Sequence, residues 1–256
     1  MLKLVCPVYN EEENIVPLLE SLARSVHTPF ELVVIYDCDD DTTLAPLRAA
    51  ATRMPFAIRE LRNAEGRGVL GAVKTGLGDG SGDAALVIMA DLADDLRIVD
   101  EMYALVSSGR FDLVAGSRYM RGGRQIGGPW FKGLLSRAAG LSLYLLTALP
   151  TRDATNNFKM YARPVLDAIE IESKAGFEIA MEITVKAYAL GFRITEIPST
   201  WTDRVAGESR FLLAKWLPHY LRWYWYALAH SGAGRRALRS KSGRHGPPMA
   251  PTKERT

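Results

Sequence analysis

The sequence has few cysteines and no long uninterrupted hydrophobic segment. Its 256 residues include only two cysteines, with no CxxC motif and no Cys/His cluster. This argues against a disulfide scaffold and a structural zinc site, and fits a reducing compartment. The four histidines are scattered along the sequence, which does not favour a Ser-His-Asp catalytic triad. No uncharged apolar run reaches the length of a conventional membrane-spanning helix, and the N-terminus turns polar too early for a signal peptide.

The positive net charge is confined to the C-terminal end of the chain. The formal net charge is +3, but residues 231–256 hold seven Lys and Arg and one acidic residue. The rest of the chain is therefore slightly negative, which does not indicate a nucleic-acid-binding body. The same C-terminal residues are rich in Gly, Ser and Pro, which predicts a disordered tail. The 48% of hydrophobic residues and 24% of charged residues are otherwise those of a globular protein.

Short apolar runs alternate with helical patterns over the first 120 residues. The apolar runs predict buried strands, and the stretches between them predict connecting helices. This alternation predicts an α/β fold with a mainly parallel sheet covered by helices. The predicted strands are 2–8, 31–36, 56–61, 84–89 and 112–116, and the predicted helices are 11–25, 44–53, 68–77 and 95–108.

The pattern changes after residue 120. It predicts, in order, a Gly-rich loop, a long apolar helix, a strand, a helix and a strand over 122–129, 130–148, 156–162, 177–190 and 193–201. Residues 211–229 then hold three of the five tryptophans, interrupted by Lys, His and Arg. This mixture is typical of a helix at a membrane interface, and a helix packed on the protein body is the alternative. Pro218 is expected to kink or break it.

Acidic residues follow three of the predicted strands, and an arginine follows a fourth. An open α/β sheet binds its ligand beyond the carboxyl ends of its strands, so these groups should converge on one rim. Oxygen ligands there can hold a divalent cation and, through it, a phosphate, although each acid taken alone also fits a helix cap. The groups are Glu11–Glu13, Asp37 with Asp39–Asp41, Asp91 with Asp94 and Asp95, and Arg118.

Residues 66–71 spell the GxGxxG pattern of dinucleotide-binding folds. That fingerprint belongs directly after the first strand, whereas here it follows the third strand across a polar linker. A nicotinamide site is therefore not expected. Glycines that open a helix instead suit a loop whose backbone approaches a ligand or a neighbouring segment closely.

The order and spacing of several motifs resemble those of the inverting family 2 glycosyltransferases. The motifs are PVYNEEENI, the Asp-rich turn after the second strand, GRGVLGAVKTGL, the acid after the fourth strand, GSRYMRGG, DATNNFKMY and DRVAGESR. The resemblance is closest to the dolichyl- or polyprenyl-phosphate mannosyltransferase branch and covers about residues 2–212. It implies a GT-A fold, in which a mainly parallel nucleotide-binding sheet carries helices on both faces.

The resemblance also implies how the chain is divided. Residues 1–120 would form the nucleotide-sugar half and 121–210 the acceptor half of one domain, followed by an aromatic interfacial helix (211–230) and a basic tail (231–256). We expect such an enzyme to lie peripherally on the cytoplasmic face of the cell membrane. A membrane protein or a second copy of the chain would be a further partner, and nucleic acid would not.

Site roles follow from the resemblance residue by residue. Residues near the strand ends would bind the nucleotide sugar, with one carboxylate, Asp37, accepting from a base N–H. These donor-binding residues are Pro7, Tyr9, Glu11, Ile35, Asp37, Ala90 and Asp91. Asp91, Arg118 and Arg204 would be the catalytic residues that act on the phosphates. The acceptor phosphate would be bound by Lys132, Arg204 and Arg210.

The metal-binding motif of the resemblance is incomplete in this chain. The family's DxD reads Met89-Ala90-Asp91, so the first acid is missing, and Ala93 replaces a polar residue. Mg²⁺ is often held by only one or two carboxylates together with substrate phosphates. We therefore still expect Mg²⁺ or Mn²⁺ on Asp91, with Asp94 as a further candidate ligand.

The chemistry depends on the acceptor. A lipid phosphate is anionic at neutral pH and needs no general base, whereas a hydroxyl acceptor requires a carboxylate to take its proton. Asp153 and Glu178 are the candidate bases, and a helix cap and a solvated helix face are their structural alternatives. We predict sugar transfer from a GDP- or UDP-sugar to a polyprenyl phosphate. Transfer to a hydroxyl of a glycan or lipid, and an inactive nucleotide-sugar-binding scaffold, are the alternatives.

Overall fold

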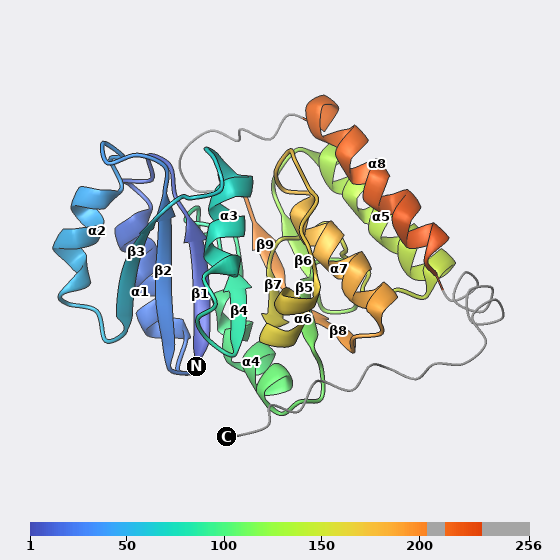
Figure 1. Ribbon diagram of the computed structural model, residues 1–256, viewed down its shortest axis with the longest axis horizontal. Coiled ribbons are helices and arrows are strands. Elements are labelled where there is room, and N and C mark those ends of the chain that lie inside the picture. Colours follow the sequence, from blue (N-terminus) through green and yellow to red (C-terminus); the bar gives the residue numbers. More distant parts are fainter. Residues whose placement is uncertain (204–212, 232–256) are drawn as a thin grey trace, which may run out of the picture.

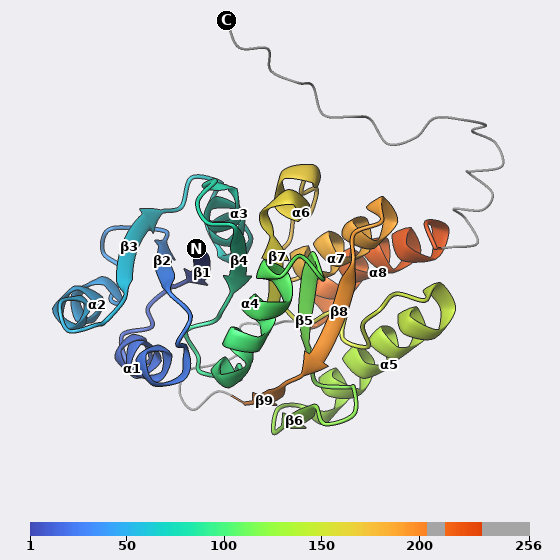
Figure 2. The same cartoon turned by 90° about the horizontal axis from the view of Figure 1, so that it is seen from below.

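A seven-stranded sheet forms the centre of the molecule (Figures 1 and 2). The computed structural model describes residues 1–203 and 213–231. The strand order is β3-β2-β1-β4-β7-β5-β8, and β7 alone runs antiparallel, between β4 and β5. The strands are β1 (Leu2–Pro7), β2 (Phe30–Tyr36), β3 (Ala57–Arg62), β4 (Ala84–Val87), β5 (Leu113–Ser117), β7 (Lys159–Ala162) and β8 (Ile194–Pro198).

Helices cover both faces of this sheet because successive strand residues point to opposite sides. In β1, Leu2 and Leu4 join a core with α1, α2 and α4, whereas Val5 joins a second core with α3 and α7. The carboxyl ends of the parallel strands form an open rim between these layers. The helices are α1 (Ile15–Ser25), α2 (Leu44–Ala51), α3 (Val69–Gly78), α4 (Val99–Ser107), which follows a short 3₁₀ turn, α6 (Arg163–Ala168) and α7 (Ile179–Leu190).

Additional elements lie beyond the β8 side of the sheet. Two short parallel strands, β6 (Arg124–Ile126) and β9 (Thr200–Thr202), pair with each other. Two long helices, α5 (Trp130–Thr147) and α8 (Leu213–Ala229), lie side by side, and α8 also packs on α7 (Figure 1). Among the helices of the described residues, none is long and apolar enough to cross a membrane.

The predicted α/β fold and its order of strands and helices are confirmed. The sequence pattern does not predict β6 or α6, and the strand expected over 193–201 divides into β8 and β9 around Ser199. Pro218 was expected to kink or break its segment; it does not break it, because α8 continues through it. Pro218 lies in the second turn of α8, where it removes a single intrahelical hydrogen bond. Buried Trp216 and Trp223 on either side hold the helix against the body.

Candidate active site

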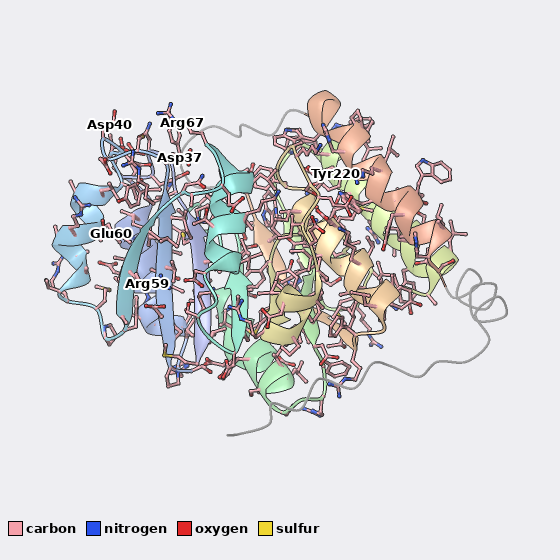
Figure 3. All side chains as sticks on the ribbon, in the orientation of Figure 1. Asp37, Asp40, Arg59, Glu60, Arg67 and Tyr220 are labelled. Carbon is pink, nitrogen blue, oxygen red and sulfur yellow. The ribbon has the colours of Figure 1, made fainter. Side chains whose placement is uncertain are left out.

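Asp37 joins two loops at the rim of the sheet. It follows β2, and its carboxylate accepts hydrogen bonds from Asn63 Nδ2 at 2.7 Å and from the Gly68 backbone N–H at 2.8 Å. Figure 3 shows Asp37 at the same end of the molecule as Asp40 and Arg67. Asp37, the carboxylate that is predicted to accept a hydrogen bond from the nucleotide base, therefore also holds the GxGxxG segment (residues 66–71) in place.

The GxGxxG segment is a close-packed turn that opens α3. Gly66 and Gly68 have φ angles of +93° and +98°, which glycine adopts readily. A Cβ on Gly71 would lie 1.8 Å from the Gly66 carbonyl oxygen, so loop and helix meet backbone to backbone. Asn63 Nδ2 donates to the same carbonyl at 2.6 Å. The turn places Arg67 at its exposed tip.

The loop after β1 supplies the other predicted donor-binding residues. The Glu11 backbone N–H donates to Thr43 Oγ1 at 2.8 Å, which ties this loop to the Asp-rich turn. Pro7 is buried at the end of β1, whereas Tyr9 is 45% exposed. Ile35 is fully buried in the core with α3. The Ile35 side chain packs inside the protein, and its predicted donor-binding role stays a prediction.

Asp91 lies beyond the end of β4, at the middle of the rim. Its Oδ1 accepts the Ala93 backbone N–H at 3.2 Å, and the preceding Ala90 is buried. The next residue, Leu92, has a φ angle of +59°, which is uncommon for a residue with a side chain. Such a turn persists only where its surroundings enforce it. The turn after Asp91 is therefore a constrained one, as is frequent at functional sites.

Asp94 supplies a second carboxylate near Asp91. Burial, followed by the negative charge of Asp91, raises the pKa of Asp94 to about 7, while Arg118 opposes the shift. No group of three or more His, Cys, Asp and Glu side chains gathers within residues 1–203 and 213–231. The donor set of one or two carboxylates fits a Mg²⁺ or Mn²⁺ ion whose remaining ligands come from substrate phosphates.

Arg118 is held by a buried carboxylate at the end of β5. Its Nε and Nη2 donate to Asp153 at 2.8 and 2.9 Å, and its backbone N–H donates to the same carboxylate at 3.0 Å. Nη2 also donates to Ser136 Oγ of α5 at 3.2 Å. Burial alone would lower the pKa of Arg118, but the charge and hydrogen bonds of Asp153 raise it, so the guanidinium stays charged. A fixed guanidinium is suited to binding phosphate oxygens.

Both carboxylates considered as general bases are already occupied. Asp153 is fully buried and accepts three N–H groups of Arg118. Glu178 is also fully buried and accepts the backbone N–H groups of Ala175 and Gly176 at 2.8 and 2.7 Å. The structure therefore assigns Asp153 to positioning Arg118, and Glu178 to capping the turn before α7. The expected solvated helix face for Glu178 is wrong because the side chain is buried.

Lys159 supports the loop that carries Asp153, and sequence reasoning missed it. Its fully buried Nζ donates to the carbonyl of Ala154 at 2.9 Å and to that of Asn156. Burial lowers the pKa of Lys159 to about 7, while the charge of Asp153 opposes the shift. The available signal was a lysine inside an otherwise apolar predicted strand, FKMYA, because a buried lysine needs a local partner.

The remaining predicted cations belong to the acceptor half. Lys132 is half-buried in the first turn of α5, four residues before Ser136 and so on the same side of the helix. Arg124 is exposed in β6. Arg204 and Arg210 lie outside the described residues, so their predicted phosphate-binding roles stay predictions.

Sequence comparison assigns the family. A model described as glycosyl transferase family 2 matches residues 4–169. The chain belongs to this family. This glycosyltransferase is 29% identical over 224 residues to the dolichol-phosphate mannosyltransferase of Pyrococcus furiosus, covering 85% of this chain and 61% of that protein. It is 27% identical to the polyprenol monophosphomannose synthase of Mycolicibacterium smegmatis, covering 80% of this chain and 79% of that protein.

Solved structures confirm the GT-A fold of the glycosyltransferase. The glucosyl-3-phosphoglycerate synthase of Mycobacterium tuberculosis superposes with a TM-score of 0.64 at 18% identity, over 91% of this chain and 80% of that one. S. aureus TarS 1–349, in complex with UDP-GlcNAc, superposes with a TM-score of 0.62 at 21% identity, over 90% and 67% of the two chains. A further structure of the mycobacterial synthase contains Mn²⁺ and uridine diphosphate.

Helix α8 directs two of its tryptophans into the body of the glycosyltransferase. Trp216 packs against Phe177, with 5.8 Å between ring centroids. Trp223 is 2% exposed, and its Nε1 donates to Ser173 Oγ at 3.1 Å. One face of α8 is therefore a packing surface, as the alternative interpretation of this segment predicts. Only its opposite face is open to a membrane.

The outward faces of α5 and α8 expose large apolar side chains. Among them, Trp130 is 77% exposed and Trp225 is 65% exposed. Most recur at the three- and four-residue spacings that place side chains on one face of a helix. Because α5 and α8 lie side by side (Figure 1), we call this set the α5–α8 apolar surface. Its members are Trp130, Phe131, Leu134, Leu145, Leu146, Leu217, Leu221 and Trp225.

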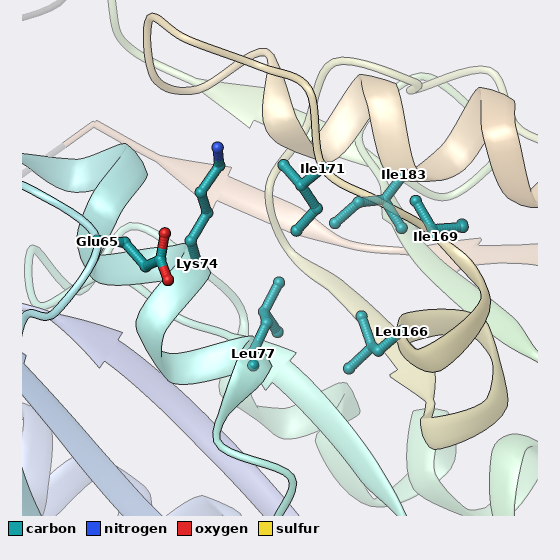
Figure 4. Close-up of a pocket in the computed structure, with 8 residues that line it drawn as sticks. Glu65, Lys74, Leu77, Leu166, Ile169, Ile171 and Ile183 are labelled. Atoms are coloured by element: carbon teal, nitrogen blue, oxygen red, sulfur yellow. The ribbon is translucent and has the colours of Figure 1, made fainter.

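A cavity of about 260 Å³ lies between α3 and the α6–α7 region (Figure 4). Mainly apolar side chains line it, together with one glutamate and one lysine. The labelled residues of this cavity are Glu65, Lys74, Leu77, Leu166, Ile169, Ile171 and Ile183. None of the predicted site residues lines it. The candidate active site is therefore the open rim of the sheet and not this cavity.

Proposed function

We propose that this glycosyltransferase moves a sugar from a GDP- or UDP-sugar to a polyprenyl-phosphate lipid, with inversion at the anomeric carbon. The main observation in support is that the acceptor half offers a fixed positive charge but no carboxylate that is free to act as a base. Both carboxylates considered as bases, Asp153 and Glu178, are buried and occupied, whereas Arg118 is fixed and charged. An anionic acceptor needs such a cation and no base. Two relatives, a dolichol-phosphate mannosyltransferase and a polyprenol monophosphomannose synthase, support the same acceptor.

On the donor side, the nucleoside would lie against the loops that Asp37 and Glu11 anchor. The sugar diphosphate would reach Asp91, where Mg²⁺ or Mn²⁺ bound with the diphosphate would neutralise the charge that develops on the leaving group. Arg118 follows β5, which β7 separates from β4, and its positive charge acts to lower the pKa of Asp94. A cation fixed before the reaction stabilises developing charge without having to reorganise.

On the acceptor side, the lipid phosphate would meet the positive groups of the second half of the chain. Lys132 lies one helical turn from Ser136, which contacts Arg118. Arg204 and Arg210 would complete this set, as the resemblance implies. A phosphate oxygen among these cations attacks the anomeric carbon from the side opposite to the departing diphosphate, which gives inversion.

The glycosyltransferase would lie peripherally on the inner face of the cell membrane. The α5–α8 apolar surface gives it an apolar contact area, because exposed patches of this kind mark interaction sites. The seven Lys and Arg of residues 231–256 would add attraction to anionic lipids. The surface consists of α5 of the acceptor half and of α8, which packs on α5, so the phosphate of a membrane-embedded lipid would be presented to the acceptor half.

A comparison of two acceptors tests the proposed function. The purified full chain is incubated with GDP- or UDP-sugars, Mg²⁺ or Mn²⁺, and vesicles that contain either a polyprenyl phosphate or the matching polyprenol. We expect sugar transfer to the phosphate only, and a product whose anomeric configuration is opposite to that of the donor. Transfer to a polyprenol or a glycan hydroxyl, without transfer to the phosphate, would contradict the proposal.

A further inference from the structure

The side chain of Asn63 joins three segments at the candidate donor site. Asn63 follows β3, and its backbone N–H donates to the Tyr36 carbonyl at 2.8 Å, which places it beside Asp37 at the end of the neighbouring strand β2. Its Nδ2 donates to Asp37 Oδ1 at 2.7 Å and to the Gly66 carbonyl at 2.6 Å. Its Oδ1 accepts the Thr75 hydroxyl at 3.0 Å. One amide therefore connects the end of β2, the GxGxxG segment and α3.

Two donors fix the direction in which the Asn63 amide points. The Ala64 backbone N–H donates to Thr75 Oγ1 at 3.0 Å, so this hydroxyl uses its own hydrogen on Asn63 Oδ1. The Glu65 backbone N–H donates to the same Oδ1 at 3.0 Å. The opposite orientation of the amide would turn its NH₂ group toward these two donors. Oδ1 is therefore held on the side of α3, and Nδ2 is held against Asp37.

The Asp37 carboxylate receives one protein donor on each oxygen. Oδ1 accepts Asn63 Nδ2, and Oδ2 accepts the Gly68 backbone N–H at 2.8 Å. These two contacts define the plane of the carboxylate. An ionised carboxylate has about four acceptor positions, so it can take a base N–H in addition to these two groups.

We propose that Asn63 is a positioning residue, which orients Asp37 so that this carboxylate accepts an N–H of the nucleotide base. The inference rests on the proposed function and adds to its donor site a residue that acts through another. A carboxylate that is already oriented loses little freedom when the base binds, and affinity rises because that cost is avoided. An amide is suited to this role because it donates to a carboxylate without adding a charge and accepts the donors of α3 and its loop.

Asn63→Ala measures the contribution of this amide to base binding. The wild type is first titrated calorimetrically with GDP and UDP in the presence of Mg²⁺, and the nucleotide that binds more tightly is used as the probe. Its affinity for Asn63→Ala should fall about tenfold, the usual loss for a hydrogen bond to a charged group. Affinity for inorganic pyrophosphate with Mg²⁺ should be unchanged, because pyrophosphate has no base.

Asn156→Ala is the matched control. Asn156 is also a largely buried asparagine, and its Nδ2 donates to a backbone carbonyl, that of Gly116, at 2.9 Å. The change removes the same atoms from the acceptor half of the chain. It should lower the melting temperature and leave the affinity for the nucleotide unchanged. An equal loss of nucleotide affinity in both variants would mean that the loss follows from general destabilisation, and it would overturn the proposal.

A double-mutant cycle with Asp37→Ala distinguishes positioning of the carboxylate from support of the GxGxxG segment. If Asn63 acts through Asp37, adding Asn63→Ala to Asp37→Ala causes no further loss of nucleotide affinity. An equal loss in both backgrounds, or an unchanged affinity of Asn63→Ala alone, overturns the proposal. If the wild type binds neither nucleotide, or if Asp37→Ala binds like the wild type, the donor site of the proposed function fails as well. If Asp37→Ala binds weakly and Asn63→Ala binds like the wild type, only the role of Asn63 fails.

Discussion

At the scale of single residues, the candidate site depends on how charged side chains are paired. Arg118 and Asp153 form two parallel hydrogen bonds in a largely buried position, and this geometry requires a guanidinium. Asp153 accepts three N–H groups, all from Arg118. The arginine is therefore held ready for an anion, and its function should be sensitive to changes that conserve its charge.

Arg118→Lys tests this sensitivity. The ammonium cannot form both hydrogen bonds to Asp153, so we expect kcat to fall by about a hundredfold, equivalent to ~2.7 kcal/mol, with a smaller change in KM. Steady-state kinetics with the nucleotide sugar and polyprenyl phosphate measure both constants. The matched control is Arg193→Lys, which alters a similar two-bond pair with Asp112 on the surface. Arg193→Lys should leave kcat and KM nearly unchanged. If Arg118→Lys changes KM alone, Arg118 does not stabilise the transition state.

The raised pKa of Asp94 predicts a pH dependence of stability. Between its ordinary pKa of 3.8 and its folded pKa of about 7, the folded state binds a proton that the unfolded state has released. Stability should therefore fall as pH rises through this range, by up to ~4 kcal/mol. Asp94→Asn should remove this slope and be more stable than the wild type at pH 8, and the two should converge near pH 4. Urea unfolding in the presence of EDTA at several pH values measures this, and parallel stability curves would contradict it.

Residue positions at strand ends were predictable, but their partners were not. Asp37, Asp91 and Arg118 could be placed because each follows a strand recognisable from its apolar pattern. The pairing of Arg118 with Asp153 joins residues 35 positions apart and depends on the return of the chain after α5. Nothing in local sequence reports such a contact. For the same reason Asp153 was a candidate base from the sequence, whereas the partners of Glu178 are the nearby backbone N–H groups of Ala175 and Gly176.

At the scale of elements, α8 shows how tertiary packing overrides local preference. From the sequence, Pro218 was expected to kink or break this segment, and the helix continues through it. Trp223 anchors it, because the ring lies 5.0 Å from Lys186 Nζ and 4.7 Å from the Arg222 guanidinium carbon while Nε1 bonds Ser173. In contrast, β6 and β9 have three residues each and exist by pairing across about 75 residues of chain. Such short strands leave no periodic pattern to detect.

Two tryptophans two residues apart on α8 should respond oppositely to the same substitution. Trp223→Ala removes a buried ring and its hydrogen bond, so we expect a loss of about 3–5 kcal/mol of stability. Trp225→Ala removes a ring that is 65% exposed and should leave stability within about 0.5 kcal/mol of the wild type. Trp225→Ala should instead reduce binding to neutral vesicles. Chemical denaturation and vesicle co-sedimentation measure the two effects, and equal destabilisation by both changes would contradict the assigned faces.

At the scale of the whole molecule, the long axis separates two functions. Strand β2, which Asp37 follows, lies toward one end, β4, which precedes Asp91, is the central strand of the sheet, and α5 with α8 forms the other end (Figure 1). Arg118, which follows β5, lies between β2 and the two helices and contacts α5 through Ser136. Under the proposed function, the donor would be bound from solution on the β2 side of the sheet, while an acceptor anchored in lipid would approach from α5 and α8.

This arrangement predicts that membrane binding has two separable components. The α5–α8 apolar surface should give affinity that salt does not weaken, whereas the charges of residues 232–256 give attraction that salt screens over about 8–10 Å. Leu145→Glu combined with Trp225→Glu should lower co-sedimentation with neutral vesicles about tenfold or more, since both side chains are exposed and their loss removes two apolar contacts with lipid. Removing residues 232–256 should lower binding mainly to anionic vesicles at low salt.

Leu190→Glu is the matched control for these changes. Leu190 is also a largely exposed leucine, but it ends α7 and does not belong to the α5–α8 apolar surface. The Leu190→Glu variant should bind vesicles like the wild type, because an isolated exposed leucine does not form an apolar patch. If Leu190→Glu weakens binding as much as the double change, contact with lipid is not confined to α5 and α8. If the double variant binds neutral vesicles normally and still glycosylates lipid in them, these helices do not contact the membrane, and the acceptor must approach the rim by another path.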